Sequence, residues 1–408
     1  MDALTWLAAA LLGTAVGVAT GVLPGVHVNT IAAVALGLPA LGPAAAVALV
    51  AVGTAHAFVQ ALPGTYLGWP GDEGFSALPA HRLVARGQGP EAVRVTLDAA
   101  LAGLVAALAA APAAAWILVH PAVADALSWL AVPVLVATLL LLLASAARKG
   151  LRHGAWSAAV LLASGALGWV ARDVPLQALF AVPASHFLPL LSGLFGVAGL
   201  VAAAQATPPP QDLPRPAGLL GSGLRVPVAL GSLASLFTLA MPGLTSASAA
   251  SWASLGRRDS ERAQVAMLSS INTAHLALSL VVLAATGQAR TGLAQAVELS
   301  QPVSFVGALP GRGAAAALAA AVLAAVLSWR AALWLEPRYR GAIRWLSPKG
   351  VAVAGTSFLA VLCLALAGWN GVLLLAASSL LGLVPLRVGV RRIHLTGSLL
   401  LPALLARL

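Results

Sequence analysis

Two copies of one short motif decide the fold: Leu23-Pro24-Gly25-Val26-His27-Val28-Asn29-Thr30 and Met241-Pro242-Gly243-Leu244-Thr245-Ser246-Ala247-Ser248. A triplet follows each copy, Thr54-Ala55-His56 beginning 30 residues after Pro24 and Thr273-Ala274-His275 beginning 31 residues after Pro242. The two prolines are 218 positions apart in a chain of 408 residues. A Pro-Gly pair interrupts a helix and frees backbone groups that the core of a membrane cannot hydrate. Its recurrence predicts two related halves, each with a broken or re-entrant helix at its motif.

The composition indicates an integral membrane protein. Hydrophobic residues make up 60% of the chain, charged residues 9%, and the mean hydropathy is +0.94. Five tracts without Asp, Glu, Lys or Arg each exceed the roughly 20 residues that cross a bilayer: Ala3–Gly71, Val174–Gln211, Val226–Gly256, Ala263–Ala289 and Val351–Leu386. We therefore expect an all-α polytopic protein of about ten to eleven transmembrane helices. Asp2 stands where a signal peptide would be basic, so the first helix is expected to stay.

The net charge of +11 comes mainly from basic residues in short loops between apolar tracts. That pattern is typical of loops kept on the cytoplasmic side, beside anionic lipid headgroups. We therefore expect a multi-pass protein of the cell (cytoplasmic or inner) membrane, in contact with lipids. Nucleic acid is not an expected partner, because no aromatic-basic module is present. Cys363 is the single cysteine, which excludes an internal disulfide and a multi-cysteine metal site.

A proline-rich stretch lies almost at mid-chain. Residues 206–223 contain Pro208-Pro209-Pro210, which favours an extended chain and predicts a hinge in water between the halves. The expected units are a first repeat at 1–205, the linker at 206–223, a second repeat core at 224–334 and C-terminal helices at 335–408. We expect inverted repeats, although this depends on whether an odd or even number of crossings separates the halves.

The residues after each break are predicted to form a substrate site. Asn, Ser and Thr cap helix N-termini, and two such N-termini facing each other at mid-membrane would offer N–H groups and positive dipole ends to a carboxylate or phosphate. The alternative is that these side chains cap their own backbone and bind nothing. The predicted substrate-binding residues are Pro24, Gly25, His27, Asn29, Thr30, Pro242, Gly243, Thr245, Ser246 and Ser248.

The two triplets are predicted to relay a proton or to support that site. An imidazole inside an apolar helix needs a partner or a wet cavity, so His56 and His275 are functional candidates, with Thr54 and Thr273 beside them. The alternative is a histidine that bonds a carbonyl across a helix interface. Asn272 and Thr273 could instead supply oxygens to a coupling cation, Na⁺ or H⁺ being the candidates.

Enzyme activity is not expected. The chain has no Gly-x-Ser-x-Gly, no His-Glu-x-x-His and no glycine-rich nucleotide loop. His275 and Ser279 are four residues apart, but no acidic residue nearby in the sequence would orient the histidine. No catalytic residue, metal site or cofactor is therefore assigned.

Several segments resemble the large permease subunit of tripartite tricarboxylate transporters (TctA-type), especially its shorter archaeal-type relatives. Gly21 to Thr30 looks like that family's Gly-Leu-x-Pro-Gly-x-x-x-Asn-Thr signature, and Trp69 to Asp72 followed by Ala77 to Ala92 resembles a second family segment. Further similar stretches are Ile271 to His275, Gly287 to Gly292 and Gly389 to Gly397. One step departs: Pro79-Ala80-His81-Arg82 stands where the family has Asp-Gly-Tyr-Pro.

The resemblance implies a carrier for small carboxylates that works with a small membrane subunit and an extracytoplasmic binding protein. The leading hypothesis is a secondary transporter for a small organic anion, a di- or tricarboxylate, since no ATP-binding motif is present. The alternatives are a polyprenyl-phosphate or other lipid-phosphate translocase that uses the same anion site, and a non-transporting membrane scaffold. A homodimer is left open.

Overall fold

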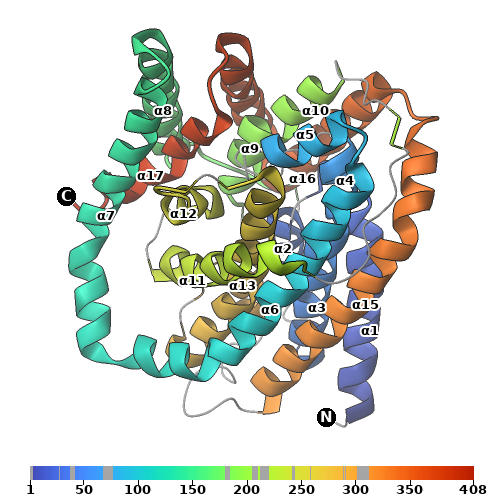
Figure 1. The fold of residues 1–408 in the computed structure, drawn as a ribbon. Coiled ribbons are helices and arrows are strands. Elements are labelled where there is room, and N and C mark those ends of the chain that lie inside the picture. Colours follow the sequence, from blue (N-terminus) through green and yellow to red (C-terminus); the bar gives the residue numbers. More distant parts are fainter. Residues whose placement is uncertain are drawn as a thin grey trace.

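The chain is described by a computed structural model. The described residues are 3–26, 28–36, 42–67, 77–179, 184–204, 210–211, 220–240, 244–257, 259–287, 289, 291–300 and 312–408. Every regular element among them is a helix, which confirms the all-α fold class (Figure 1).

The first half of the chain forms helices up to the proline-rich linker. They are α1 (Ala3–Gly21), α2 (Val28–Leu36), α3 (Pro43–Val59), α4 (Ala61–Tyr66), α5 (Ala77–Ala85), α6 (Gly89–Val119), α7 (Pro121–Ala147), α8 (Leu151–Ala171), α9 (Phe187–Leu191), the π-helix η1 (Ser192–Val197) and α10 (Ala198–Ala203).

The second half follows a similar order at its start. Its elements are η2 (Ser222–Leu224), α11 (Arg225–Ala240), α12 (Ser246–Ala253), α13 (Glu261–Thr286), α14 (Gly292–Ser300), α15 (Arg312–Ile343), α16 (Pro348–Val388), η3 (Arg392–Thr396) and α17 (Gly397–Leu405).

The helices fit a polytopic membrane protein. Within the described ranges, 8 helices are long and apolar enough to cross a bilayer, and three shorter apolar helices accompany them: Phe187–Ala203, Arg225–Leu239 and Arg392–Leu405. The eight long helices of the described ranges are fewer than the ten to eleven crossings expected, because three apolar segments form helices shorter than a bilayer span. The chain is therefore a multi-pass membrane protein, and which membrane holds it stays a prediction.

Glycines set the distance between α1 and α3. Gly13, Gly17 and Gly21 recur every fourth residue on the face of α1 that packs against α3. A Cβ added at Gly17 would lie 2.7 Å from the Cβ of Ala55, and one at Gly21 2.7 Å from the Cβ of Val59. Small residues at this spacing let two membrane helices pack backbone to backbone.

The same contact recurs between α11 and α13. A Cβ added to Gly13 would lie less than 3.0 Å from the carbonyl oxygen of Ala48. A Cβ added to Gly231 would lie less than 3.0 Å from the carbonyl oxygen of Met267. Gly13 and Gly231 are 218 positions apart, which is the separation of Pro24 and Pro242. The repeat in the sequence therefore extends to a repeated helix pair, while its inverted symmetry stays a prediction.

Each helix pair also packs against a long helix from the opposite half of the chain. The long helix α6 packs along α13, where a Cβ at Gly103 would lie 2.6 Å from the Cα of Ser270. Likewise α15 packs along α3 and α1, and Ala324 shares a buried cluster with Ala51 and Ala55 of α3. The core of the molecule is thus built from both halves.

A second bundle lies beside this core. Helix α8 packs against α17, and α16 packs against α9, η1 and α10, with close contacts at glycines such as Gly193 against Ser378. In Figure 1, α8 and α17 lie at the upper left, away from α1 and α15 at the lower right. Segments of the predicted units 1–205 and 335–408 therefore share one bundle.

Helix α16 contains a sharp kink. Its 41 residues would extend about 60 Å, twice the thickness of the hydrocarbon core. Gly368 adopts φ 69°, which is accessible to glycine at little cost. The N–H of Leu179 donates to the carbonyl oxygen of Ala365 at 2.9 Å, and the side chain of Asn370 donates to that of Pro175 at 2.8 Å. The loop before α9 thus satisfies the Ala365 carbonyl at the kink, and Asn370 in turn satisfies a carbonyl of that loop.

At Gln211 the linker departs from the solvated hinge that its prolines predict. Of the described linker residues, 210–211 and 220–223, Pro210 is exposed, whereas Gln211 is only 4% exposed. The side chain of Gln211 accepts from the N–H of Gly89 at 2.8 Å and donates to the carbonyl of Val84 at 2.7 Å, while Arg340 donates to its backbone carbonyl. A polar side chain that satisfies buried backbone groups anchors the chain here, and proline content alone does not reveal this.

Candidate functional site

Each triplet histidine contacts a threonine in the last turn before a break. The Nδ1 atom of His56 lies 3.1 Å from Oγ1 of Thr20, and Nδ1 of His275 lies 2.6 Å from Oγ1 of Thr238. Thr20 and Thr238 each stand four residues before the proline of their motif. The two halves therefore share a side-chain contact as well as a motif.

Each of these threonine hydroxyls also reaches a backbone carbonyl in its own helix. The hydroxyl of Thr20 donates to the carbonyl of Val16 at 3.0 Å, and that of Thr238 donates to the carbonyl of Ser235 at 2.7 Å. A hydroxyl has one proton, so when that proton is donated to the carbonyl, the threonine receives its other bond from the Nδ1–H of the histidine. A neutral ring then keeps its lone pair on Nε2, which makes Nε2 an acceptor or a proton-binding atom.

The triplet threonines differ between the halves. Thr273 donates to the carbonyl of Ala100 on α6 at 2.6 Å, so it holds the two halves together. Thr54 is 1% exposed, and its hydroxyl has no hydrogen-bond partner within the described ranges. Asn272 is half-buried. Thr273 thus bonds a helix of the other half, whereas the hydroxyl of Thr54 is buried without a described partner.

The first break lies where the motif predicts it. Helix α1 ends at Gly21, residues 22–25 form turns, Gly25 adopts φ 89°, and α2 begins at Val28. The hydroxyl of Tyr339 on α15 donates to the carbonyl of Val22 at 3.3 Å, which satisfies one freed backbone group. Asn29 and Thr30 stand in the first turn of α2, whereas His27 and the side chains of both lie outside the described part.

The second break is described from Leu244 onward; Pro242 and Gly243 lie outside the described residues. Thr245 is the N-cap of α12, and its hydroxyl accepts from the N–H of Ser248 at 3.2 Å. That confirms the expected capping role. The hydroxyl of the buried Ser248 lies 3.1 Å from that of Thr245, and Ser246 is half-buried beside them. The hydroxyl of Thr245 therefore already bonds a backbone N–H of its own helix.

The helices that follow the two breaks contact different neighbouring helices. Helix α2 packs against α14, α3 and α9, and α12 packs against α11, α13 and α7. A direct meeting of the two N-termini at one substrate site stays a prediction.

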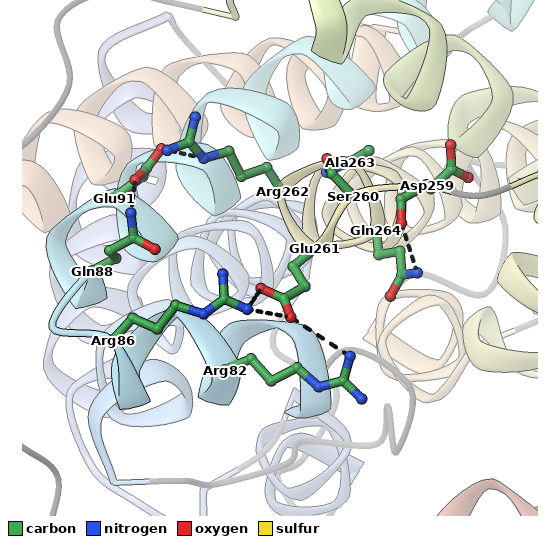
Figure 2. A network of polar contacts seen from close by, with 10 residues as sticks. All are labelled: Arg82, Arg86, Gln88, Glu91, Asp259, Ser260, Glu261, Arg262, Ala263 and Gln264. Atoms are coloured by element: carbon green, nitrogen blue, oxygen red, sulfur yellow. Dashed lines mark hydrogen bonds and ion pairs between the residues drawn. The ribbon is translucent and has the colours of Figure 1, made fainter.

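An ion-pair network joins the two halves at the start of α13. Figure 2 shows Arg82 and Arg86 converging on Glu261 while Arg262 reaches back to Glu91. The N–O distances are 3.6 Å and 2.6 Å for Arg82 and Arg86 to Glu261, and 2.6 Å for Arg262 to Glu91. The arginines are exposed and the carboxylates are largely covered. Charged side chains thus cross between the α5–α6 segment and α13 in both directions.

Two buried carboxylates are paired. Asp98 on α6 accepts from Arg94 at 2.7 Å and from the indole N–H of Trp329 at 2.9 Å. Glu336 on α15 accepts from Arg340 at 3.1 Å and from the hydroxyl of Tyr66. A buried carboxylate needs such partners, and the bonds to Trp329 and Tyr66 link α15 to α6 and to α4.

Within the described residues, no group of three or more His, Cys, Asp and Glu side chains could hold a metal ion.

Sequence reasoning missed Thr20, Thr238 and the buried acid pairs. A signal for the threonines existed, because both precede their proline by four residues. The acid pairs had only the spacing of four between Arg94 and Asp98 and between Glu336 and Arg340, which is common on helix surfaces.

Comparison with known proteins identifies the family. The model of the tripartite tricarboxylate transporter TctA family matches residues 7–397. The uncharacterized protein MJ1079 of Methanocaldococcus jannaschii is 40% identical over 86 residues, which are 20% of this chain and 22% of that relative. No solved structure matches the chain. Since the family match covers both motifs and both triplets, the chain belongs to the tripartite tricarboxylate transporter TctA family.

Proposed function

We propose that the chain is the membrane permease of a secondary transport system for a small organic anion, a di- or tricarboxylate. The observation that carries the proposal is the repeated constellation of a helix break with a histidine bonded to the threonine one turn before it. A duplicated break with the same polar support is what a substrate site between two repeats requires. Membership of a family of transporters agrees with this function.

The substrate would lie between the N-terminal ends of α2 and α12. Carboxylate oxygens would accept from backbone N–H groups and from the hydroxyls of Ser246 and Ser248, with the helix dipoles adding favourable charge. A site of this kind binds an anion without a buried arginine, so the anion is not held too tightly to leave. The proposed substrate-binding residues are those predicted from the sequence at the two Pro-Gly motifs.

The histidines would couple the substrate to an ion gradient. With Nδ1 bonded to threonine as the donor, Nε2 of His56 and His275 would be the atom that takes up a proton. Na⁺ is the alternative coupling ion, with the side-chain oxygen of Asn272 as a ligand.

The network around Glu261 and Glu91 would act as a gate at one end of the molecule. It joins the α5–α6 segment to α13, two parts that belong to different halves and must separate if the halves rock against each other. In the family's tripartite arrangement, a small membrane subunit and an extracytoplasmic binding protein would be the partners.

Uptake by proteoliposomes tests the proposal. Full-length protein, reconstituted with and without its binding protein, is offered radiolabelled citrate, succinate and malate under an imposed Na⁺ or proton gradient. We expect gradient-dependent uptake of at least one of them, and at least a tenfold loss in Asn29→Leu and in Asn272→Leu. Asn370→Leu is the matched control, because Asn370 lies exposed on α16. Uptake that survives in both site variants would remove these residues from the site.

A further inference from the structure

The segment between α16 and α17 carries a buried arginine with an unused donor. Arg392 is 9% exposed, and its Nη2 donates to the carbonyls of Phe195 at 2.6 Å and Leu194 at 3.2 Å in the π-helix η1. Its Nε–H has no hydrogen-bond partner within the described chain. A guanidinium is always charged and only donates, so a buried N–H without an acceptor is unfavourable. The arginine is held rigidly with one donor left over.

Two histidines near this arginine repeat the pattern. His394 is 1% exposed and its Nδ1 has no partner within the described residues, although its backbone carbonyl accepts from Ser164 at 3.2 Å. The Nε2 of His81, on α5, is buried and equally without a described partner. Three buried nitrogens from two distant parts of the chain thus lack a described hydrogen-bond partner, and that of Arg392 is necessarily a donor.

The surrounding charges are mainly positive. Burial and the nearby charge of Arg392 lower the pKa of His81 to about 4. Burial, then Arg391 and Arg82, lower the pKa of Lys149 in the turn between α7 and α8. Arg391 and His153 are also within electrostatic reach of His394. Glu261 pairs with Arg82 at 3.6 Å, but it is shared with Arg86.

We propose that these residues, the basic cluster (His81, Arg82, Lys149, Arg391, Arg392 and His394), bind a phosphate-type oxyanion. Such an anion has several acceptor oxygens, so it accepts from the unused N–H of Arg392 and offsets the repulsion among the arginines and Lys149, while a histidine N–H can donate to it as well. It has two sources, the headgroup of an anionic phospholipid and free phosphate. The site is separate from the breaks and does not depend on the proposed transport function.

The first measurement compares ligands by their effect on the melting temperature. Full-length protein is stripped of lipid in a neutral detergent and mixed with phosphatidylglycerol, phosphatidylcholine of the same chains, or inorganic phosphate at constant ionic strength. A ligand that binds the folded state raises the melting temperature by mass action. We expect phosphatidylglycerol to raise it by several degrees and phosphatidylcholine to have little effect. A matching effect of inorganic phosphate would identify a free oxyanion as a ligand, and its absence would identify the lipid headgroup.

Variants locate the binding. Lys149→Gln and His81→Gln should each weaken binding of phosphatidylglycerol at least tenfold. Lys149 lies exposed in a turn, so its variant keeps the core packing. Arg387→Gln removes the same charge from an exposed position at the end of α16, and its affinity should stay within twofold of the wild type. Equal stabilisation by both phospholipids, or an equal loss in Arg387→Gln, would overturn the proposal.

Discussion

At the scale of single residues, the bonds from His56 to Thr20 and from His275 to Thr238 define the chemistry available behind the breaks. Each bond holds the imidazole ring through Nδ1, beside a threonine whose hydroxyl also reaches a backbone carbonyl. The same contact through Nδ1 recurs in both halves, so Nε2 is the ring nitrogen that faces away from the threonine in each.

Removing the threonine hydroxyls tests this role. Thr20→Val and Thr238→Val keep the shape of the side chain and leave the buried Nδ1 atom without its hydrogen-bond partner, at a cost of about 1 to 3 kcal/mol. We expect a lower melting temperature and uptake reduced at least fivefold, with a changed dependence of uptake on pH. Thr→Ser at either position restores the hydroxyl and should recover uptake. Valine variants that transport normally would show that the bonds only support packing.

A second residue-scale prediction concerns pH. The pKa of His81 is lowered from 6.5 to about 4 by burial and by Arg392, so between these values the unfolded chain binds more protons than the folded one. Stability is therefore full above about pH 6.5 and falls as the pH drops toward 4, by at most about 3 kcal/mol. His81→Gln should lose part of the acid-induced decrease in melting temperature between pH 6.5 and 4.5. His120→Gln, at an exposed position, should keep it.

How far the sequence predicts these sites depends on the kind of interaction. The capping role of Thr245 follows from local backbone chemistry, so the motif alone suffices. The partner of His56 lies 36 residues away and that of Arg392 nearly 200, so neither appears before the helices are packed. Gln211 belongs to the same class, because its burial depends on α6 and α15.

At the scale of helices, the close approach of α1 to α3 and of α11 to α13 depends on single glycines. Gly13→Ala and Gly231→Ala each place a methyl group against a backbone carbonyl of the partner helix. We expect each to lower stability by about 1 to 3 kcal/mol through overpacking. Gly341→Ala on α15 meets nothing within 4 Å, so it should be neutral or stabilising by up to about 1 kcal/mol. Thermal unfolding in detergent measures all three.

The helices α2 and α12 carry the prediction of a shared site. In a Cys363→Ala background, Asn29→Cys combined with Ser246→Cys should be joined by a short bismaleimide, and citrate or another transported anion should slow the reaction. Asn29→Cys with Asn370→Cys is the control pair, because Asn370 lies on the exposed side of α16. Joining of the control pair alone would place the two N-termini at separate sites.

At the scale of the whole molecule, the broken helices and the two-half organisation could be read from the sequence because a Pro-Gly break has local causes. Two other arrangements could not be predicted from the sequence. One is the packing of α6 and α15 against helices of the opposite half, and the other is the bundle of α8 with α16 and α17. Those arrangements arise from alanine- and glycine-rich faces that fit many partners equally well, so only packing in three dimensions selects among them.

The exchange of helices gives the ion-pair network its expected function. Arg262 pairs with Glu91 at 2.6 Å across the two halves, so a covalent bond there should prevent the halves from separating. In a Cys363→Ala background, oxidation of Glu91→Cys with Arg262→Cys should reduce uptake at least tenfold, and a reductant should restore it. Arg257→Cys with Asp259→Cys joins residues of one loop and should leave uptake unchanged after oxidation. Full uptake by the oxidised Glu91–Arg262 pair would mean that these ion pairs hold the two halves together throughout the cycle and that the gate lies elsewhere.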